Sequence, residues 1–415
     1  MQEEAYETIR TNDEVILLSP TGTGKTLAFL LPLISQIDRE IRAVQVLILV
    51  PSRELAIQIE RVVREMGTGL KVNAVYGGRA GAKDREDLKH APSILVGTPG
   101  RVADHLRRKT VSVEHLTTLV LDEFDKSLEI GFEKEMKEII GGLRQLKKKI
   151  LTSATQRIEI PEFVGVRWPK KITYLGEKTN LLSIKTVVSP TQNKLDTLTQ
   201  LLGKIGEGNG IIFCNLKATI EYLSDHLLSK KIGHACFFGG LEQRDRERAL
   251  IKFRNGTHRL LLATDLAARG IDVPELDFII HYQIPFSAEE FTHRNGRTAR
   301  MHQNGTAYIL KFEGHDLPEY IDDYETIEVH SDKTPSRSTW GTLFISGGRK
   351  DKISKGDIAG LFFKQGGLQK DELGVIELKK DCAFVSVPIS KAHDLIGKLN
   401  NVRLKKKKVR ITYVD

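Results

Sequence analysis

One stretch near the start of the chain, VILLSPTGTGKT at residues 15–26, decides the fold. Four apolar residues lead into a serine and a proline, two glycines follow, and an apolar segment resumes after the lysine. This order predicts a strand, a glycine loop and a helix. Gly22 and Gly24 let consecutive backbone N–H groups face an anion, which the positive end of the following helix also attracts. The stretch therefore predicts a phosphate-binding loop.

The side chains at the end of this loop suit a nucleotide phosphate and its metal. Lys25 supplies a positive charge for the outer phosphates, and the Thr26 hydroxyl is a ligand for Mg²⁺. Ser19 stands where the complete Gly-x-x-x-x-Gly-Lys-[Ser/Thr] pattern has glycine. A chance Gly-Lys-Thr beside a turn is therefore the alternative, and the rest of the chain must decide against it.

Positive charge is concentrated at the C-terminal end of the chain. The 415 residues include 63 Lys and Arg and 54 Asp and Glu, which gives a net charge of +9. From Gly341 onward there are 16 basic and 8 acidic residues, so this segment carries +8 of that total. The imbalance favours a polyanion-binding module attached to a nearly neutral body, with a solvated basic face as the alternative.

Cysteine usage and hydropathy indicate a cytoplasmic protein. The three cysteines, Cys214, Cys236 and Cys382, are far apart, show no metal-binding spacing and suit reduced thiols. The first residues are acidic and polar, unlike a secretory signal peptide, and no apolar run approaches the ~18 residues of a membrane span. We therefore expect neither secretion nor membrane insertion.

The pattern of apolar runs predicts an α/β fold class. Nearly continuous apolar runs that alternate with longer amphipathic segments are typical of parallel strands covered by helices on both faces. The economical interpretation is two doubly wound parallel-sheet domains in tandem. The expected strands are 15–18, 46–50, 94–96, 119–121 and 150–151 in the first domain, and 211–213, 260–263, 278–280 and 307–310 in the second.

A smaller unit follows an acidic stretch and a linker-like segment. Its order of strand, helix, strand, strand, helix, strand is that of the ferredoxin-like split and of RNA-recognition modules. The expected boundaries are 1–175 and 183–330 for the large domains, 331–340 for the linker and 341–415 for a small, RRM-like α+β domain.

Two acids follow one of the expected strands directly. Asp122 and Glu123 come after 119–121, at the sheet edge where doubly wound folds bind ligands. Asp122 is suited to hold Mg²⁺, and Glu123 to orient or deprotonate an attacking water. Helix capping is the structural alternative, but a phosphate loop upstream favours the catalytic interpretation.

A cluster of arginines lies in the second expected domain. Residues 293–300 hold three arginines, and Arg297 and Arg300 lie three apart on one face of an expected helix. Such side chains can meet phosphate oxygens as forks. The alternative is a solvated or salt-bridged helix face.

Taken in order, these segments resemble the motifs of the superfamily 2 DEAD-box RNA helicases across essentially the first 330 residues. The matching segments are 19–26 (motif I), 51–56 (Ia), 77–78 (the glycine doublet), 98–101 (Ib), 122–125 (II), 153–155 (III), 213–215 (IV), 243–246 (the Gln-x-x-Arg element), 268–272 (V) and 293–300 (VI). Gln2 lies 23 residues before Lys25, the spacing of the family's adenine-reading glutamine. The resemblance implies RecA-like domains and an RNA-stimulated ATPase.

The resemblance also implies roles for individual residues toward ATP and Mg²⁺. The catalytic residues would be Lys25, Asp122, Glu123, Arg297 and Arg300; the nucleotide contacts Gln2, Thr21, Gly22, Thr23, Gly24, Lys25, Thr26 and Asp272; and the metal ligands Thr26 and Asp122, partly through water. Arg297 and Arg300 would act as arginine fingers, a role worth ~10³–10⁵ in rate. Ser153 and Thr155 would couple hydrolysis to the second domain.

RNA would be held along its sugar-phosphate backbone, which fixes position without reading sequence. The implied contacts are Pro51, Arg53, Gly77, Gly78, Thr98, Pro99, Gly100, Arg101, Arg246 and Thr264. Bending one strand in the closed state would separate a short duplex locally. A plain turn is the alternative interpretation of the glycine doublet.

From about Thr342 onward the chain resembles the small RNA-binding domain of the DbpA subgroup of these helicases. That subgroup binds a hairpin of large-subunit ribosomal RNA, so the resemblance implies a 23S-type target during ribosome biogenesis, in a pre-ribosomal particle, by a monomer. Cys382 and Val387 occupy positions where aromatic residues usually stack on bases, while Phe344 and Phe384 remain as stacking or core residues. Salt-sensitive binding would rest instead on Arg349, Lys350, Lys352, Lys405, Lys406, Lys407 and Lys408.

The chain departs from the family pattern at three places besides Ser19. Phe124 replaces the alanine of motif II, and its ring needs space beside the motif III strand. Ala299 replaces the glycine of motif VI, a mild change if the backbone there is helical. The aromatic residue upstream of Gln2 is absent, which implies either a truncated start or weaker nucleotide binding.

The leading hypothesis is an ATP-dependent RNA helicase acting on structured ribosomal RNA. The alternative is a non-catalytic assembly factor or a non-unwinding, ATP-gated RNA clamp. A DNA helicase is disfavoured by the RNA-type terminal module.

Overall fold

A computed structural model describes the chain except for residues 21, 79–80, 156–159, 176–181, 269–270, 272, 274–275, 300–303, 332 and 415. The predictions for Thr21, Asp272 and Arg300 fall outside these described residues. Contacts within the chain define two compact units, one built on residues 1–180 and the other on most of residues 181–415. Among the described helices, none is long and apolar enough to cross a membrane.

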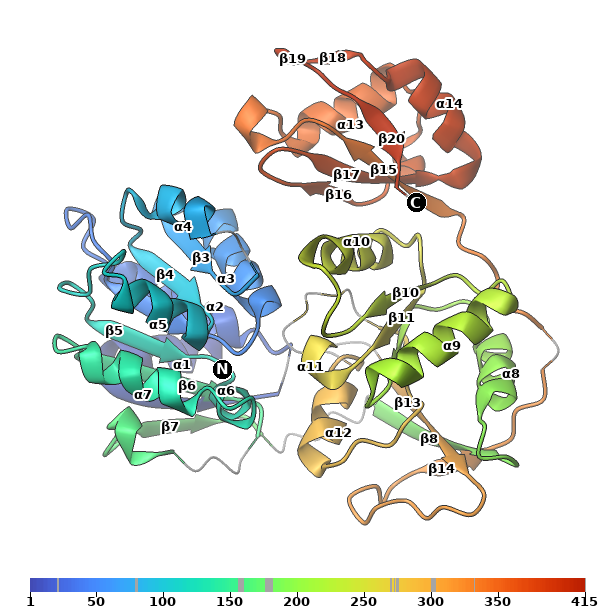
Figure 1. Cartoon of the computed structure of the whole chain (residues 1–415), viewed down its shortest axis with the longest axis horizontal. Coiled ribbons are helices and arrows are strands. Elements are labelled where there is room, and N and C mark those ends of the chain that lie inside the picture. The colour runs from blue at the N-terminus through green and yellow to red at the C-terminus, as the bar shows by residue number, and fades with distance from the viewer. Residues whose placement is uncertain are drawn as a thin grey trace. The chain divides into compact units, whose positions relative to one another are not determined.

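The first unit is built on a parallel seven-stranded sheet in the order β3-β4-β2-β5-β6-β1-β7 (Figure 1). Its strands are β1 (Glu14–Leu18), β2 (Val46–Leu49), β3 (Val72–Val75), β4 (Ile94–Gly97), β5 (Thr118–Leu121), β6 (Lys148–Ser153) and β7 (Lys170–Thr173). Its helices are α1 (Gln2–Thr11), α2 (Lys25–Gln36), α3 (Arg53–Glu65), α4 (Gly81–Leu88), α5 (Pro99–Arg107), α6 (Phe124–Glu129) and α7 (Glu133–Gly142).

Successive residues of the inner strands alternate between two apolar cores, one on each face of this sheet. Val46 and Ile48 share a core with α1, α2 and α3, whereas Leu47 and Leu49 share one with α5 and α7. Strands that are buried on both faces have no polar side, which explains their unbroken runs of Val, Ile and Leu.

The second unit repeats this plan with a sheet in the order β10-β11-β9-β12-β13-β8-β14, which corresponds to the first order strand for strand. Its strands are β8 (Leu182–Ser189), β9 (Gly210–Phe213), β10 (His234–Phe237), β11 (Leu260–Ala263), β12 (Phe278–His281), β13 (Gly305–Phe312) and β14 (Glu325–Ile327). Its helices are α8 (Leu195–Ile205), α9 (Lys217–Ser229), α10 (Gln243–Arg254), α11 (Asp265–Ala268) and α12 (Ala288–Asn295).

The second unit also contains a smaller antiparallel sheet, which we call the terminal domain. Its strand order is β16-β17-β15-β20, and Leu343, Val385 and Ile411 lie on the face that packs against α13 and α14. The elements are β15 (Trp340–Ile345), α13 (Lys355–Lys364), β16 (Ile376–Leu378), β17 (Ala383–Pro388), α14 (Ile389–Leu399) and β20 (Ile411–Tyr413), with a hairpin of β18 (Arg403–Leu404) and β19 (Lys407–Lys408). This is the expected ferredoxin-like order.

The predicted fold class is confirmed: two parallel sheets in tandem precede a small α+β domain. The sequence analysis missed the strands β3, β7, β8, β10 and β14 and the β18–β19 hairpin. Four of the missed strands lie at the edges of their sheets, and β8 mixes polar with apolar residues. The edge strands β7, β10 and β14 are less buried, so their sequences carry a weaker apolar signal. The edge strand β3 is buried, but Asn73 interrupts its short apolar run.

Candidate active site and nucleic-acid surface

The carboxyl ends of the first sheet gather the selected residues of the first unit. Those implied in ATP chemistry follow β1, β5 and β6, which are neighbours in the sheet, except Gln2, which begins α1. Those implied in RNA binding follow β2, β3 and β4, which are also neighbours. One sheet edge therefore has a nucleotide half and an RNA half, and the two halves meet where β2 pairs with β5.

The glycine loop after β1 has the backbone that a phosphate cradle requires. Gly22 and Gly24 have φ values of 85° and 89°, in the left-handed region that glycine tolerates best. Gly24 is the N-cap of α2, so the first N–H groups of the helix face the loop. A Cβ at Gly24 would lie 2.4 Å from Gln2 Nε2. The structure thus brings the predicted adenine-reading glutamine against the loop.

Lys25 and Ser19 form hydrogen bonds within the glycine loop. Lys25 is 8% exposed, and its Nζ donates to the carbonyl oxygens of Ser19 and, at 2.8 Å, Pro20. Ser19 is fully buried, and its Oγ lies 2.6 Å from Thr23 Oγ1. The serine that replaces the usual glycine therefore contributes a hydrogen bond to the loop.

The acid pair after β5 is anchored by a residue that the sequence analysis missed. The pairing of Leu121 with Leu151 places residues 122 and 152 side by side, 30 positions apart in the chain. The Thr152 hydroxyl donates to Asp122 Oδ1, and the Glu123 N–H lies 3.3 Å from Thr152 Oγ1. Only the register of the two strands reveals this contact.

The donor set at this position fits a divalent cation. Asp122 is 3% exposed, and burial raises its pKa while the hydrogen bond from Thr152 and the charge of Lys25 lower it. A cation would stabilise a carboxylate that burial destabilises. The Asp122 carboxylate and the Thr26 hydroxyl are oxygen ligands, the type that Mg²⁺ prefers.

Glu123 is held in a backbone conformation unusual for its type. Its φ of 48° and ψ of 50° are left-handed, and it forms the N-cap of α6. Such strain costs of order 1–3 kcal/mol and is concentrated at functional sites.

Phe124 and the residues around it connect motif II to motif III. The Phe124 ring is fully buried in the core shared by the first sheet, α5 and α7, together with Leu151 of the motif III strand, so the ring finds the space it needs. The Thr155 hydroxyl donates to Asp125 Oδ2 at 3.2 Å, and Ser153 Oγ lies 3.1 Å from Thr155 Oγ1.

The RNA half of the edge contains two arginines in defined positions. Arg53 lies against the glycine doublet, because a Cβ at Gly78 would lie 2.6 Å from Arg53 Nη1. Arg101 donates from Nε and Nη2 to Asp84 Oδ2, at 2.9 and 2.7 Å. Asp84 is fully buried and was not selected from the sequence. The remaining selected residues are Pro51, which follows β2, and Thr98, Pro99 and Gly100, which begin α5.

The structure places two of the selected residues of the second unit. Arg246 on α10 is 9% exposed, with its guanidinium 4.8 Å from the centre of the Phe237 ring, and Thr264 directly follows β11. The expectation that Arg297 lies on a helix is wrong, because α12 ends at Asn295 and Arg297 lies in the turn that follows. Arg300 lies outside the described residues.

Ala299 lies beyond that helix end, with a φ of 52°. Its left-handed backbone favours glycine, so the replacement of the motif VI glycine is not the mild change expected for a helical position.

Arg294, the first of the three clustered arginines, is a structural residue. It is 1% exposed and forms a bidentate pair with Asp265, with Nε–Oδ1 2.7 Å and Nη2–Oδ2 2.5 Å. It also donates to Asn215 Oδ1 and to the Gln283 carbonyl, both at 2.7 Å. Arg294 of motif VI therefore contacts motif IV at Asn215 and the segment just before motif V at Asp265. Its donors are directed at protein acceptors rather than at a phosphate.

The sheet of the terminal domain places the expected base-stacking positions on two different faces. Val387 is fully buried in the helix-facing core, so the prediction that it occupies a base-stacking position is wrong. Phe344 and Phe384 pair across β15 and β17 on the opposite face, with ring centroids 5.6 Å apart.

The four lysines of residues 405–408 differ in their ion pairs. Lys405 pairs with Asp357 at 2.9 Å and Lys407 with Asp351 at 2.8 Å. Lys405, Lys406 and Lys408 are exposed, and Lys407 is half-buried. Arg349 and Lys350 are exposed in the turn after β15.

Comparison with known families and proteins covers nearly the whole chain. Residues 1–163 match the DEAD/DEAH box helicase family, 193–302 the helicase conserved C-terminal domain and 342–413 the DbpA RNA binding domain. The ATP-dependent RNA helicase DbpA of Escherichia coli is 32% identical over 99% of this chain and 93% of that protein. The protein of the same name from Bacillus subtilis is 29% identical over 96% of this chain and 91% of its own length.

A solved structure is similar in fold over the residues of both large sheets. S. cerevisiae Dbp5 bound to RNA and ADP BeF3 superposes with a TM-score of 0.68 and 28% identity, over 80% of this chain and 89% of that one.

Proposed function

The chain belongs to the DEAD-box family of ATP-dependent RNA helicases, and from that premise we propose that it locally unwinds large-subunit ribosomal RNA during ribosome assembly. The observation that carries the proposal is the division of one sheet edge into a nucleotide half and an RNA half. In addition, the terminal domain matches a family of RNA-binding domains. We propose that the protein acts as a cytoplasmic monomer.

In the nucleotide half, each residue has a role that its surroundings support. Gln2 reads the adenine edge, because its amide can donate and accept at once. Lys25 leaves the loop carbonyls for the outer phosphates, which are stronger acceptors. Glu123 orients or deprotonates the attacking water, and the hydrogen bonds around Thr152 hold it beside Asp122. Thr26 and Asp122 would hold Mg²⁺, which when bound neutralises charge on the phosphate oxygens.

We assign the transition-state charge of hydrolysis to Arg297 and Arg300. Arg297 is 6% exposed and follows the end of α12. Arg294 supports this assignment indirectly, because its bonds to Asp265 and Asn215 fix the segment from which Arg297 projects. Asp272 would contact the ribose.

RNA is held by backbone contacts in the core and by basic side chains in the terminal domain. The core contacts are Pro51, Arg53, Gly77, Gly78, Thr98, Pro99, Gly100, Arg101, Arg246 and Thr264. In the terminal domain the RNA contacts are Lys406 and Lys408, together with Arg349 and Lys350, all of which are exposed. Lys405 is exposed too, but it pairs with Asp357. Contacts of this type fix position without reading sequence.

The decisive experiment compares ATP hydrolysis with large-subunit ribosomal RNA, with poly(U) and without RNA. We expect stimulation by both RNAs, the ribosomal RNA acting at the lower concentration. Glu123→Gln should reduce the stimulated rate by ~10²–10⁴ because it removes the general base. Stimulation no greater than that of this variant would reject the enzymatic proposal, and hydrolysis without strand displacement would identify a clamp.

Salt dependence tests the terminal contacts. Lys406→Ala with Lys408→Ala should reduce the slope of log affinity against log salt by about 2, since each phosphate contact contributes about 0.9. Lys398→Ala, on α14 and paired with Asp394, is the control and should leave the slope unchanged. An unchanged slope in the double variant would remove these two lysines from the RNA surface.

A further inference from the structure

The turn after α10, residues 254–257, contacts the outer face of the terminal domain's sheet; we call it the docking turn. Arg254 donates from Nε and Nη2 to the two carboxylate oxygens of Glu377, at 2.6 and 2.9 Å. The two side chains are only 17% and 9% exposed. A bidentate pair removed from water in this way fixes both the distance and the angle between its partners.

Two hydroxyl residues of the sheet complete the contact. Ser386 Oγ donates to the Asn255 carbonyl at 2.7 Å, and the Thr257 and Thr342 hydroxyls lie 2.7 Å apart. Thr342 and Ser386 are 0% and 1% exposed, although neither faces the apolar core of the domain. The docking turn therefore supplies the partners that these buried hydroxyls need.

The backbone of the docking turn suits this close approach. Gly256 has a φ of 73°, which ends α10 and reverses the chain. A Cβ at Gly256 would lie 3.9 Å from Trp340 Cδ1, so the turn lies directly against the start of β15.

The covered face is the one that RNA-recognition modules normally use to stack bases. Here Thr342 and Ser386 in its middle and Glu377 beside them contact the docking turn. The Phe344–Phe384 pair lies on the same two strands and the same face, next to the Thr342–Ser386 pair. The sheet face is therefore largely a protein contact.

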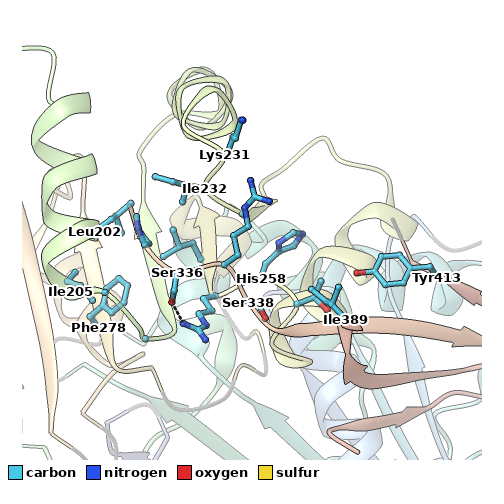
Figure 2. Close-up of a pocket in the computed structure, with 18 residues that line it drawn as sticks. Leu202, Ile205, Lys231, Ile232, His258, Phe278, Ser336, Ser338, Ile389 and Tyr413 are labelled. Carbon is cyan, nitrogen blue, oxygen red and sulfur yellow. Dashed lines mark hydrogen bonds between the residues drawn. The ribbon is translucent and has the colours of Figure 1, made fainter. Parts of the chain in front are cut away.

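The linker is tied to the second sheet as well. Ser338 Oγ donates to the Gly256 carbonyl, Arg259 Nη1 donates to Ser336 Oγ at 3.1 Å, and Ser336 donates to Glu207 at 2.9 Å. Figure 2 shows the cavity of about 240 Å³ beside these contacts, lined by His258, by Ser336 and Ser338 of the linker, and by Tyr413 of the terminal domain.

Helix α10 connects this contact to the core RNA surface. Arg246 lies near its first turn and Arg254 is its last residue, so the 12-residue helix separates them by roughly 12 Å at 1.5 Å per residue. We propose that the docking turn and the sheet face form a fixed joint, through which α10 holds the terminal domain at one distance from Arg246. RNA bound by the basic loops is then presented to the core in one register. The RNA part of this proposal rests on the proposed function.

A distance measurement tests the joint without ATP or RNA. Spin labels at Ser229→Cys and Gln365→Cys, both exposed, report the separation of the second sheet and the terminal domain after Cys214, Cys236 and Cys382 are replaced. We expect one narrow distance distribution. Arg254→Glu and Glu377→Arg should each broaden it, because like charges then face each other, and the double exchange should restore it. Lys230→Glu, an exposed site with the same charge change, is the control.

The second readout is ATP hydrolysis by the same variants. Arg254→Glu should keep poly(U)-stimulated hydrolysis within about twofold and lose most of the additional stimulation by large-subunit ribosomal RNA, with recovery in the double exchange. A broad distribution in the unmodified chain, or an unchanged one in both single variants, would overturn the joint. A broadened distribution with full ribosomal RNA stimulation would overturn its role in presenting RNA. Absence of any hydrolysis would reject the proposed function and leave the distance result valid.

Discussion

The loops after β1 and β8 occupy corresponding places in two sheets of matching strand order, yet only the first has a phosphate cradle. Both loops begin Ser-Pro-Thr and reach a lysine at the start of a helix, over residues 19–25 and 189–194. The first loop contains Gly22 and Gly24, whereas the second has Gln192 and Asn193 and is one residue shorter.

The two lysines have different environments. Lys194 donates to the carbonyl oxygens of Tyr282 and, at 3.0 Å, Leu310, and its Nζ lies 4.7 Å from the centre of the Tyr282 ring. Burial lowers its pKa to about 8. Lys25 donates only a few residues back, to carbonyls of its own loop. The comparison teaches that left-handed glycines make the cradle, and that without them the same lysine becomes a link between strand ends.

The two lysines should differ most in their effect on ATP hydrolysis. Lys25→Ala should lower RNA-stimulated kcat/KM for ATP by ~10²–10³, the usual effect of removing one preorganised charge-stabilising group. The melting temperature should fall by less than in Lys194→Met, because Pro20, one of the two residues whose carbonyl oxygens Lys25 contacts, is exposed to water. Steady-state hydrolysis and thermal unfolding check this pair of outcomes, and near-normal activity would contradict the assignment of Lys25.

Lys194→Met should have the opposite profile. We expect the free energy of unfolding to fall by about 2–3 kcal/mol, because two buried carbonyls lose a charged donor. Hydrolysis per folded molecule should stay within about twofold. Urea unfolding followed by activity measurements at low denaturant tests this, and lost activity with unchanged stability would show that the second loop still serves the nucleotide.

The pH dependence of the free energy of unfolding tests the buried environment of Lys194. Between about pH 8 and 10.5 the unfolded chain binds more protons at Lys194 than the folded chain, so this residue adds stability as the pH rises. Cys214 and Tyr282, whose pKa values burial raises to about 12, act in the opposite direction. The unmodified chain should therefore gain about 1 kcal/mol over Lys194→Met between pH 8 and 9.5. A constant difference in urea titrations would exclude the shift.

The smallest effect is expected at Ala299. Ala299→Gly should raise the free energy of unfolding by about 0.5–1 kcal/mol, because its φ of 52° is strained for alanine but not for glycine. Ala288→Gly, at the start of α12, is the control and should be neutral or destabilising. Chemical denaturation of the unmodified chain and the two variants measures these differences. A loss of stability in Ala299→Gly would contradict the prediction, because it would show that the backbone at residue 299 is not strained.

The inner strands and the nucleotide residues could be predicted from sequence, because each rests on neighbouring positions. An apolar run predicts a buried strand, and Gly-Thr-Gly-Lys-Thr predicts a phosphate loop, without knowledge of any distant residue. The contact of Thr152 with Asp122 spans 30 positions and depends on the register of β5 with β6.

The role of Arg294 could not be predicted either, because its partners are far away in the sequence. Its spacing from Arg297 gives no sign that Asp265 and Asn215 occupy its donors. The helix α12 ends at Asn295, and Ala299 has a left-handed backbone. Both features depend on how residues 295–299 pack in the folded chain, where Thr298 forms a β-bridge with Leu276, 22 positions away. Such a contact cannot be predicted from neighbouring residues.

Phe124 bears on how this chain could have diverged from its relatives. Its ring is fully buried, and replacing such a phenylalanine by the family's alanine costs ~3–5 kcal/mol, a large share of the ~5–15 kcal/mol that keeps a domain folded. A descendant could regain alanine only after neighbouring side chains had grown to fill the space. The residue that departs from the family's signature is thus held in place by the side chains packed around it.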